Sequence, residues 1–134
     1  DAPKKFGIEQ NVIFLDFVPD SDLPALYKHA VCFALPSLYE GFGLPVLEAM
    51  AYRTPVVVSN VSSLPEIAGK AGIYVDPQDV ESIAKGLERA VFERDKKPGK
   101  DRIAEGLNQV KKFTWENAAK QTLEVLEEVG KGSI

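Results

Sequence analysis

Short apolar runs alternate along the chain with segments of helical length, and this alternation restricts the possible folds more than any other feature. The runs lie at residues 12–17, 31–35, 56–59 and 73–75. They consist almost entirely of β-branched, aromatic and other apolar residues, which is typical of parallel strands covered on both faces. The pattern predicts an α/β fold with a Rossmann-like, doubly wound parallel sheet whose strands are joined by crossover helices.

Helices are expected between these runs and in the last third of the chain. Asp20, Ser21 and Asp22 are typical capping residues for a helix that ends near Ala30. The other expected helices cover residues 44–52, 64–68, 80–91, 102–112 and 115–129. Asp79 and Thr114 are expected to cap the helices that follow them.

The segment between two of these helices, residues 93–101, is charged and contains Pro98-Gly99. Both features favour an exposed connection over a continuous helix.

A chain of 134 residues has the size of a single domain with one hydrophobic core. We expect one folded unit over residues 1–129 and a frayed tail at 130–134. The aromatic side chains expected in its core are those of Phe14, Phe17, Phe33 and Trp115. The chain opens without Met on a short polar lead, so we expect it to be a piece of a longer protein.

Charge and composition exclude several classes of protein. Sixteen Lys and Arg against 20 Asp and Glu give a net charge of −4, which argues against a nucleic-acid partner. The single cysteine, Cys32, excludes an internal disulfide and a cysteine-based zinc cluster. No apolar stretch reaches the ~18 residues of a transmembrane span and no signal peptide opens the chain, so we expect a cytoplasmic protein.

No metal site is expected either. Asp20 and Asp22 are spaced like an Asp-x-Asp metal motif, but they stand directly before a helix, where capping is the expected role. His29 falls near the end of that helix, where it is expected to be exposed.

One segment differs from the rest, because it connects a predicted buried strand to a helix at the edge where α/β sheets bind ligands. Gly41 and Gly43 allow unusual backbone conformations and a close approach of a ligand. Pro45 suits the first turn of the following helix. The amides of Gly41, Phe42, Gly43 and Leu44, with the helix dipole, predict a binding site for an anion such as a phosphate.

Two glutamates flank this loop. Glu48 lies in an otherwise apolar helix, where a carboxylate is costly unless it is paired or faces a polar ligand. Helical side chains lean toward the N-terminus, so Glu48 should face the loop, where it could accept two neighbouring ribose hydroxyls. Glu40 would lie on the other side of the loop from Glu48. The alternative for Glu48 is a structural role at the helix dipole.

The segment E-G-F-G-L-P-V-L-E-A-M-A at residues 40–51, followed by T-P-V-V-V-S at 54–59, resembles the donor-sugar motif of retaining glycosyltransferases of family 4. The resemblance extends through V-I-F-L-D-F-V (12–18), L-P-A-L-Y (23–27), A-G-I-Y-V-D-P (71–77) and F-T-W (113–115). It implies the C-terminal, donor-binding lobe of the two-lobed GT-B architecture, with at least one further strand–helix unit before residue 1.

The resemblance also implies roles for single residues. Glu40 is implied to be the catalytic residue that contacts the transferred sugar, and Glu48 to hold the ribose of the donor. Together with Gly41, the backbone of Phe42, Gly43 and Leu44 is implied to bind sugar and phosphate.

A nucleoside diphosphate sugar is the implied donor, and a hexose-type sugar passes to an acceptor hydroxyl without a cofactor or metal. Phe17 and Val18 are expected near the base. The acceptor, a sugar or a lipid-linked or other hydroxyl compound, would be bound by the second lobe, which could also place the protein peripherally at a membrane.

The family supplies an arginine and a lysine beside the diphosphate from a segment before the first strand of this chain. Lys4 and Lys5 lie in an irregular lead and are expected to be solvated. Developing negative charge on the leaving group requires positive charge nearby, so the chain alone is expected to be inactive.

Two other functions stay open at this point. The first is a non-catalytic module of the same fold that binds nucleotide sugars or interacts with another protein. The second is a related two-lobed enzyme such as a nucleotide-sugar epimerase, to which the paired glutamates are a poor match. The sequence does not indicate the base, the sugar, the acceptor or the oligomeric state.

Overall fold

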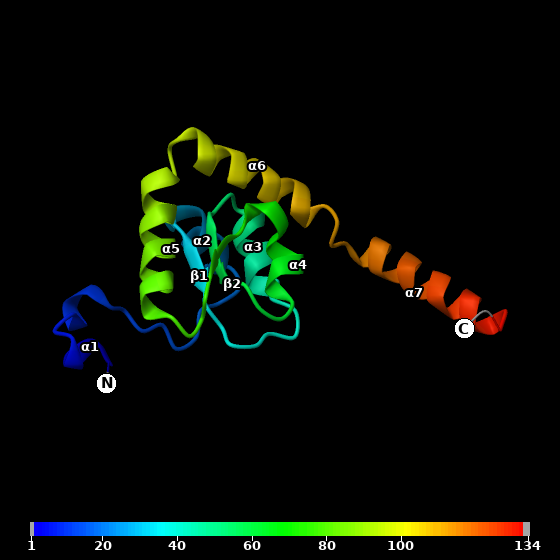
Figure 1. Ribbon diagram of the computed structural model, residues 1–134, viewed down its shortest axis with the longest axis horizontal. Coiled ribbons are helices and arrows are strands. Elements are labelled where there is room, and N and C mark those ends of the chain that lie inside the picture. The colour runs from blue at the N-terminus through cyan, green and yellow to red at the C-terminus, as the bar shows by residue number, and fades with distance from the viewer. Residues whose placement is uncertain (1, 133–134) are drawn as a thin grey trace.

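The computed structural model describes residues 2–132 and has a small parallel sheet at its centre (Figure 1). Its strands, in spatial order, are β1 (Phe33–Leu35), β2 (Val56–Ser59) and β3 (Ile73–Val75). In this sheet Val57 lies opposite Ala34 on one side and opposite Ile73 on the other. The predicted α/β class and parallel sheet are confirmed.

The strand predicted at residues 12–17 is not formed. The segment is exposed, with Ile13 at 84% and Phe17 at 83% of full exposure. Apolar and β-branched composition favours a strand, but a strand also needs a neighbour for its backbone hydrogen bonds. Within residues 2–132, no other segment pairs with this one.

Helices connect the strands and continue beyond them. In chain order they are α1 (Ala2–Lys5), the 3-10 turn η1 (Glu9–Asn11), α2 (Leu23–His29), α3 (Leu44–Ala51), α4 (Leu64–Ala68), the 3-10 turn η2 (Gly69–Ala71), α5 (Val80–Glu93), α6 (Lys97–Val110) and α7 (Trp115–Gly130). The lead that was expected to be irregular therefore contains a short helix, α1, on which Lys4 and Lys5 are both exposed.

Two of the three predicted helix caps are confirmed. Asp79 and Thr114 accept hydrogen bonds from the backbone N–H groups of Glu81 and Asn117, in the first turns of α5 and α7. Asp22 precedes α2, but its carboxylate accepts no N–H of that helix and is bonded instead by the neighbouring serine hydroxyl.

The exposed connection predicted at residues 93–101 is wrong in its second half, because α6 begins inside it. Pro98 lies in the first turn of α6, where proline is favoured since that N–H has no partner within the helix. The Glu93 carboxylate then joins the helices, 2.7 Å from Arg102 Nη2 and 2.9 Å from Arg89 Nε. These hydrogen bonds, that of Arg102 first, hold the pKa of Glu93 below its ordinary value.

The core is centred on β2, where Val56, Val57 and Val58 are at most 1% exposed. Val56 and Val58 belong to the apolar cluster formed with α3 and α4, and Val57 belongs to the cluster formed with β3 and α5. A Cβ at Gly86 of α5 would lie 2.3 Å from Val75 Cγ1, so this glycine allows α5 to pack closely on the sheet. Both faces of the sheet are covered, as a doubly wound fold requires.

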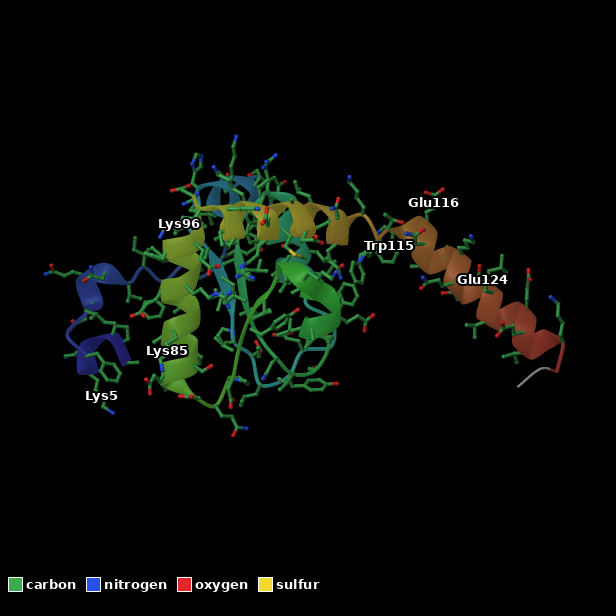
Figure 2. The ribbon with its side chains drawn as sticks, turned by 45° about the horizontal axis from the view of Figure 1, so that its top comes forward. Lys5, Lys85, Lys96, Trp115, Glu116 and Glu124 are labelled. Atoms are coloured by element: carbon green, nitrogen blue, oxygen red, sulfur yellow. The ribbon has the colours of Figure 1, made fainter. Side chains whose placement is uncertain are left out.

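Helix α7 extends away from the rest of the molecule (Figures 1 and 2). All of its residues are exposed, including Trp115 at 93%. The expectation that Trp115, Phe14 and Phe17 lie in the core is therefore wrong, whereas Phe33 packs against it. Among residues 2–132, no helix combines the length and the apolar character that a membrane crossing needs.

Of residues 130–134, which were expected to form a frayed tail, the structure describes 130–132. Gly130 is the last residue of α7, and the two residues after it form a turn. The remainder of that segment lies outside the described residues.

Candidate functional site

The loop between β1 and α3 forms the predicted strand-to-helix junction at the carboxyl edge of the sheet. Gly43 directly precedes α3 with φ +110°, a conformation that side chains rarely adopt. A Cβ on Gly43 would also lie 2.9 Å from Leu64 Cδ2. Gly41 has neither a positive φ nor any atom within 4 Å of a would-be Cβ. Of the two loop glycines, therefore, Gly43 needs to be glycine because of its backbone conformation, and Gly41 does not.

In this loop, the carbonyl groups of Glu40, Phe42 and Gly43 accept hydrogen bonds within the protein, whereas the amides that follow Glu40 donate none among the described residues. Gly43 C=O accepts from Val46 N–H at 2.9 Å, and the carbonyls of Glu40 and Phe42 accept from serine hydroxyls. Within residues 2–132, the N–H groups of four consecutive residues have no acceptor: Gly41, Phe42, Gly43 and Leu44. These amides lie at the positive end of the α3 dipole, so the arrangement is one that could bind an anion.

Glu40 is half-buried at the start of this loop. Its Oε1 accepts a hydrogen bond of 2.8 Å from the Ser37 hydroxyl. The Ser59 hydroxyl donates in turn to the Ser37 carbonyl, so the end of β2 supports the end of β1. The turn after β2 holds the Glu40 backbone through Ser62 and Ser63.

Glu48 is exposed on α3, past the first turn of that helix. This position does not support the alternative in which it acts on the helix dipole, since that effect is confined to the terminal turn. Its Oε2 accepts a 2.9 Å hydrogen bond from the Tyr27 hydroxyl of α2. One carboxylate oxygen is thereby held by the protein, and among the described residues none bonds Oε1.

Tyr27 is itself held by aromatic neighbours. Its ring stacks on Tyr52 with centroids 6.1 Å apart and meets the Phe33 ring edge-on at 5.7 Å. Burial, then the hydrogen bond to Glu48 and the charge of Glu48, raise the pKa of Tyr27 to about 12. The phenol therefore keeps its proton at neutral pH and remains a donor to Glu48.

The other loop side chains turn elsewhere. The Phe42 ring packs edge-on against Phe113, with centroids 5.8 Å apart, so only its backbone is available to a ligand at the loop. Leu44 is 61% exposed in the first turn of α3.

Phe17 and Val18 lie in a separate groove of about 750 Å³ along α2. Its lining contains Asp22 and Leu26 of the α2 region, but neither the loop residues 40–44 nor Glu48. Helix α2 borders both places, because Leu26 lines the groove while Tyr27 reaches Glu48. The structure therefore places Glu40 and the glycine loop after the carboxyl end of β1, and Glu48 on α3 beside Tyr27. Phe17 and Val18 lie in a separate groove.

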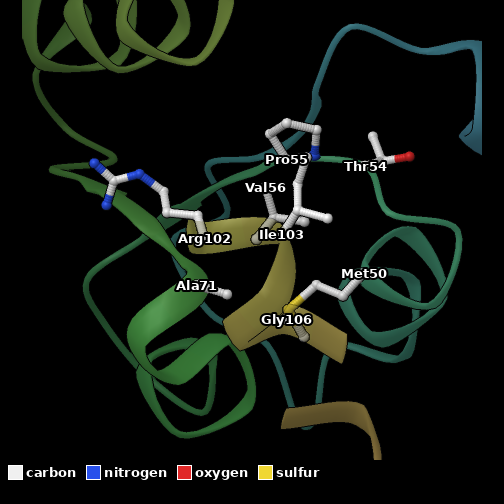
Figure 3. A pocket seen from close by; sticks show the side chains of 8 residues that line it. All are labelled: Met50, Thr54, Pro55, Val56, Ala71, Arg102, Ile103 and Gly106. Atoms are coloured by element: carbon white, nitrogen blue, oxygen red, sulfur yellow. The ribbon is translucent and has the colours of Figure 1, made fainter. Parts of the chain in front are cut away.

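A second, much smaller cavity lies between α3 and α6 (Figure 3). Met50 and Gly106 line it, and its volume of about 10 Å³ has room for at most one water. It is a packing gap and no part of the candidate site. Within residues 2–132, no group of three His, Cys, Asp or Glu side chains is arranged to hold a metal ion.

Sequence reasoning missed four residues of this site: Tyr27, Ser37, Ser62 and Ser63. One available signal was that Ser62 and Ser63 lie in the short turn after a buried strand, which ends at Ser59. The carboxyl ends of neighbouring parallel strands meet at one edge of a sheet, so residues after β2 were candidates to touch the loop after β1. No local pattern pairs Tyr27 with Glu48.

Comparison with known proteins adds independent information. The family model described as "Glycosyl transferases group 1" matches residues 2–107. The O-antigen chain mannosyltransferase B of Escherichia coli is 49% identical over 110 residues, which are 82% of this chain and 28% of that protein. The D-inositol 3-phosphate glycosyltransferase of Corynebacterium urealyticum is 35% identical over 127 residues, 93% of this chain and 30% of that protein.

Among solved structures, the sucrose-phosphate synthase of Thermosynechococcus elongatus matches with a TM-score of 0.81 and 28% identity. The match covers 98% of this chain and 33% of that one. The chain thus spans a third or less of the length of each of these three proteins.

Proposed function

Because the chain belongs to the glycosyl transferases group 1 family and matches the C-terminal part of a GT-B glycosyltransferase, we propose that it binds the nucleotide-sugar donor of a retaining glycosyltransferase. The whole enzyme would move a hexose-type sugar from a nucleoside diphosphate to an acceptor hydroxyl. The observation that carries this proposal is the run of amides without an acceptor among the described residues, Gly41 to Leu44, with Glu40 at its start and Glu48 on the helix that follows it.

Each part of the site suits one part of such a donor. Glu48 would accept the two hydroxyls of the ribose, because a carboxylate accepts hydrogen bonds side by side. The amides of Gly41 to Leu44 would donate to the diphosphate, whose negative charge grows as the sugar leaves. Glu40 would contact the transferred sugar from the other end of the loop. Phe17 and Val18, on the α2 groove, are the residues proposed to lie near the base.

The transfer step itself needs more than these residues. Fixed positive charge beside the leaving diphosphate lowers the barrier to its departure. Lys5 of α1 lies on the other side of α5 from α3, the helix that the loop leads into (Figures 1 and 2). We therefore propose that this chain binds the donor without transferring the sugar, that a segment before its first strand supplies the cations, and that a second lobe binds the acceptor. A cytoplasmic location belongs to the same proposal.

The Escherichia coli relative is named as a mannosyltransferase and the Corynebacterium relative as a glycosyltransferase. Mannosyl donors are therefore the first to test. Calorimetric titration of UDP, GDP and ADP sugars, mannose among them, would identify the donor. We expect Glu48→Ala to weaken binding at least tenfold, because a charged hydrogen-bond partner contributes ~1.5–3 kcal/mol.

The matched control is Glu124→Ala, which removes an exposed carboxylate on α7 and should leave the affinity unchanged (Figure 2). Equal affinities of the wild type and Glu48→Ala would contradict the role of Glu48. Failure of every nucleotide sugar to bind the wild type would contradict the proposed function.

A further inference from the structure

We propose that Ser62 and Ser63 are positioning residues that set which way the loop amides of Gly41 and Gly43 point, and so prepare the loop for a diphosphate. This inference rests on the function proposed above. Both serines lie on the turn between β2 and α4, more than twenty residues along the chain from the loop they hold.

The contacts are made between hydroxyl groups and the loop backbone. The Ser62 hydroxyl donates to the Glu40 carbonyl at 2.6 Å and accepts from the Glu40 N–H at 3.3 Å. The Ser63 hydroxyl lies 2.7 Å from the Phe42 carbonyl and 3.0 Å from that of Glu40. One hydroxyl carries one proton, so Ser63 donates to one of these carbonyls at a time, and Phe42 offers the shorter bond.

The geometry of the peptide unit turns these contacts into an orientation. A trans peptide is planar, and its C=O and N–H groups point in opposite directions. Fixing the Glu40 carbonyl against the serines therefore turns the Gly41 N–H away from them. Fixing the Phe42 carbonyl does the same for the Gly43 N–H. Both of these N–H groups are among those without an acceptor in residues 2–132.

Glycine makes such anchoring necessary. A residue without a Cβ has access to many backbone conformations, so the peptides before Gly41 and Gly43 can rotate easily. A rotated peptide would present its carbonyl oxygen, which repels a phosphate, in place of its N–H. The surroundings of Gly41 leave room for such a rotation, because no other atom lies within 4 Å of the place where its Cβ would be.

The backbone of Ser62 indicates that the turn is built for this contact. Its φ of +58° lies in the left-handed region, which is uncommon for residues other than glycine. Non-glycine residues in this region are under strain and persist where the surroundings require them. Here the strained residue places a hydroxyl that both donates to and accepts from the same residue, Glu40.

The test uses variants that remove each hydroxyl without disturbing the backbone. Ser62→Gly keeps the left-handed conformation without strain, and Ser63→Ala removes the second hydroxyl. Ser63→Thr retains a hydroxyl and is the conservative rescue. Ser21→Ala is the matched control, because the Ser21 hydroxyl bonds only its exposed neighbour Asp22.

Two readouts are needed. The first is NMR of the ligand-free protein, in which the amide signals of Gly41 and Gly43 report whether the loop keeps one conformation. The second is the affinity for the nucleoside diphosphate that the wild type binds, compared with the affinity for the same nucleoside without phosphate.

We expect the double variant Ser62→Gly/Ser63→Ala to broaden or split both glycine signals. Its affinity for the diphosphate should fall roughly tenfold, as expected for the loss of about two hydrogen bonds. Its affinity for the nucleoside should change less than twofold. Threonine at position 63 in place of alanine should restore the diphosphate affinity that Ser63→Ala removes. Ser21→Ala should match the wild type. A general loss of structure would instead weaken both ligands together.

Other outcomes overturn the inference. Unchanged glycine signals in the double variant contradict the anchoring, whatever the wild type binds. A loosened loop with undiminished preference for the diphosphate contradicts the positioning role. A wild type that binds no diphosphate contradicts the proposed function, and the positioning role with it, even if the loop signals respond to the serines.

Discussion

The hydroxyl of Tyr27 and the carboxylate of Glu48 show how single residues shape the candidate site. Glu48 was singled out because its helix is otherwise apolar, but its carboxylate is exposed, so the expected cost of burying it does not arise. Tyr27 was not singled out, because its partner is 21 positions away and only the packing of α2 against α3 brings them together. The same holds for Ser62 and Ser63. Local motifs identify the residues of a site, whereas long-range contacts decide how those residues are held.

Replacing Tyr27 by Phe should separate orientation of Glu48 from folding. The ring contacts with Phe33 and Tyr52 remain, so the variant should fold, but one oxygen of Glu48 loses its donor. We expect donor affinity to fall roughly three- to tenfold, the range of one hydrogen bond. Calorimetric titration measures this change, and an affinity equal to that of the wild type would show that Tyr27 does not orient Glu48.

Tyr27 also predicts a dependence of stability on alkaline pH. Its pKa is near 10 in an unfolded chain and about 12 in the fold, so the stabilisation is complete below pH 10. As pH rises from 10 to 12, the unfolded chain loses the proton while the native state keeps it, and the stabilisation is lost. Urea unfolding across this range should show a smaller loss for Tyr27→Phe. Parallel losses in both proteins would contradict the assignment.

The two loop glycines form a matched pair of substitutions. Gly43→Ala places a Cβ at φ +110° and 2.9 Å from Leu64 Cδ2, which should lower the free energy of unfolding by about 1–3 kcal/mol. Gly41→Ala meets neither obstacle and should change it by less than about 0.5 kcal/mol. Denaturant unfolding of the two variants tests this difference, and equal stabilities would show that the loop adapts.

At the scale of helices and strands, burial decides which predictions succeed. The strands at 56–59 and 73–75 were predicted to the residue because a buried run leaves few alternatives. The run at 12–17 has similar composition but no strand beside it among residues 2–132, so the same signal misled. Pro98 misled in another way, since proline both ends and begins helices and only the residues around it show which.

Helix α5 offers a test of element packing. Gly86→Ala adds ~1 kcal/mol of helix propensity, but its Cβ would lie 2.3 Å from Val75 Cγ1 and 3.1 Å from Val57 Cγ1. Overpacking at such a site costs roughly 1–3 kcal/mol, so the clash should win and the melting temperature should fall. Gly130→Ala, with no atom within 4 Å, should leave it unchanged. A more stable Gly86→Ala would mean that α5 is less closely packed than described.

On the scale of the whole molecule, helices cover both faces of the sheet and form a packed α/β body with it. In contrast, α7 and residues 12–17 expose apolar side chains. No sequence pattern distinguishes an apolar stripe that is buried by the same chain from one that is not. Leu123 and Leu126 of α7, for example, recur at helical spacing but are 56% and 63% exposed. Periodicity therefore predicted the helix correctly and its burial wrongly.

Removal of α7 should accordingly have little effect on the body. A chain that ends at residue 113 keeps the contact between Phe113 and Phe42, and the described residues that it loses, 114–132, are all exposed. Its melting temperature should match that of the full chain, because a lone helix of this length is marginally stable in water. A fall of several degrees would show that α7 packs against the body in solution.

The proposed function requires a nucleoside diphosphate sugar to bind at the loop between Glu40 and Glu48. NMR titration of the isotopically labelled chain with such a donor tests it most directly. We expect the amide signals of Gly41 to Leu44 to shift most, and the shifts at the same subsaturating donor concentration to be several times smaller in Glu48→Gln. Shifts that leave these four amides unmoved, or that persist unchanged in Glu48→Gln, would contradict it.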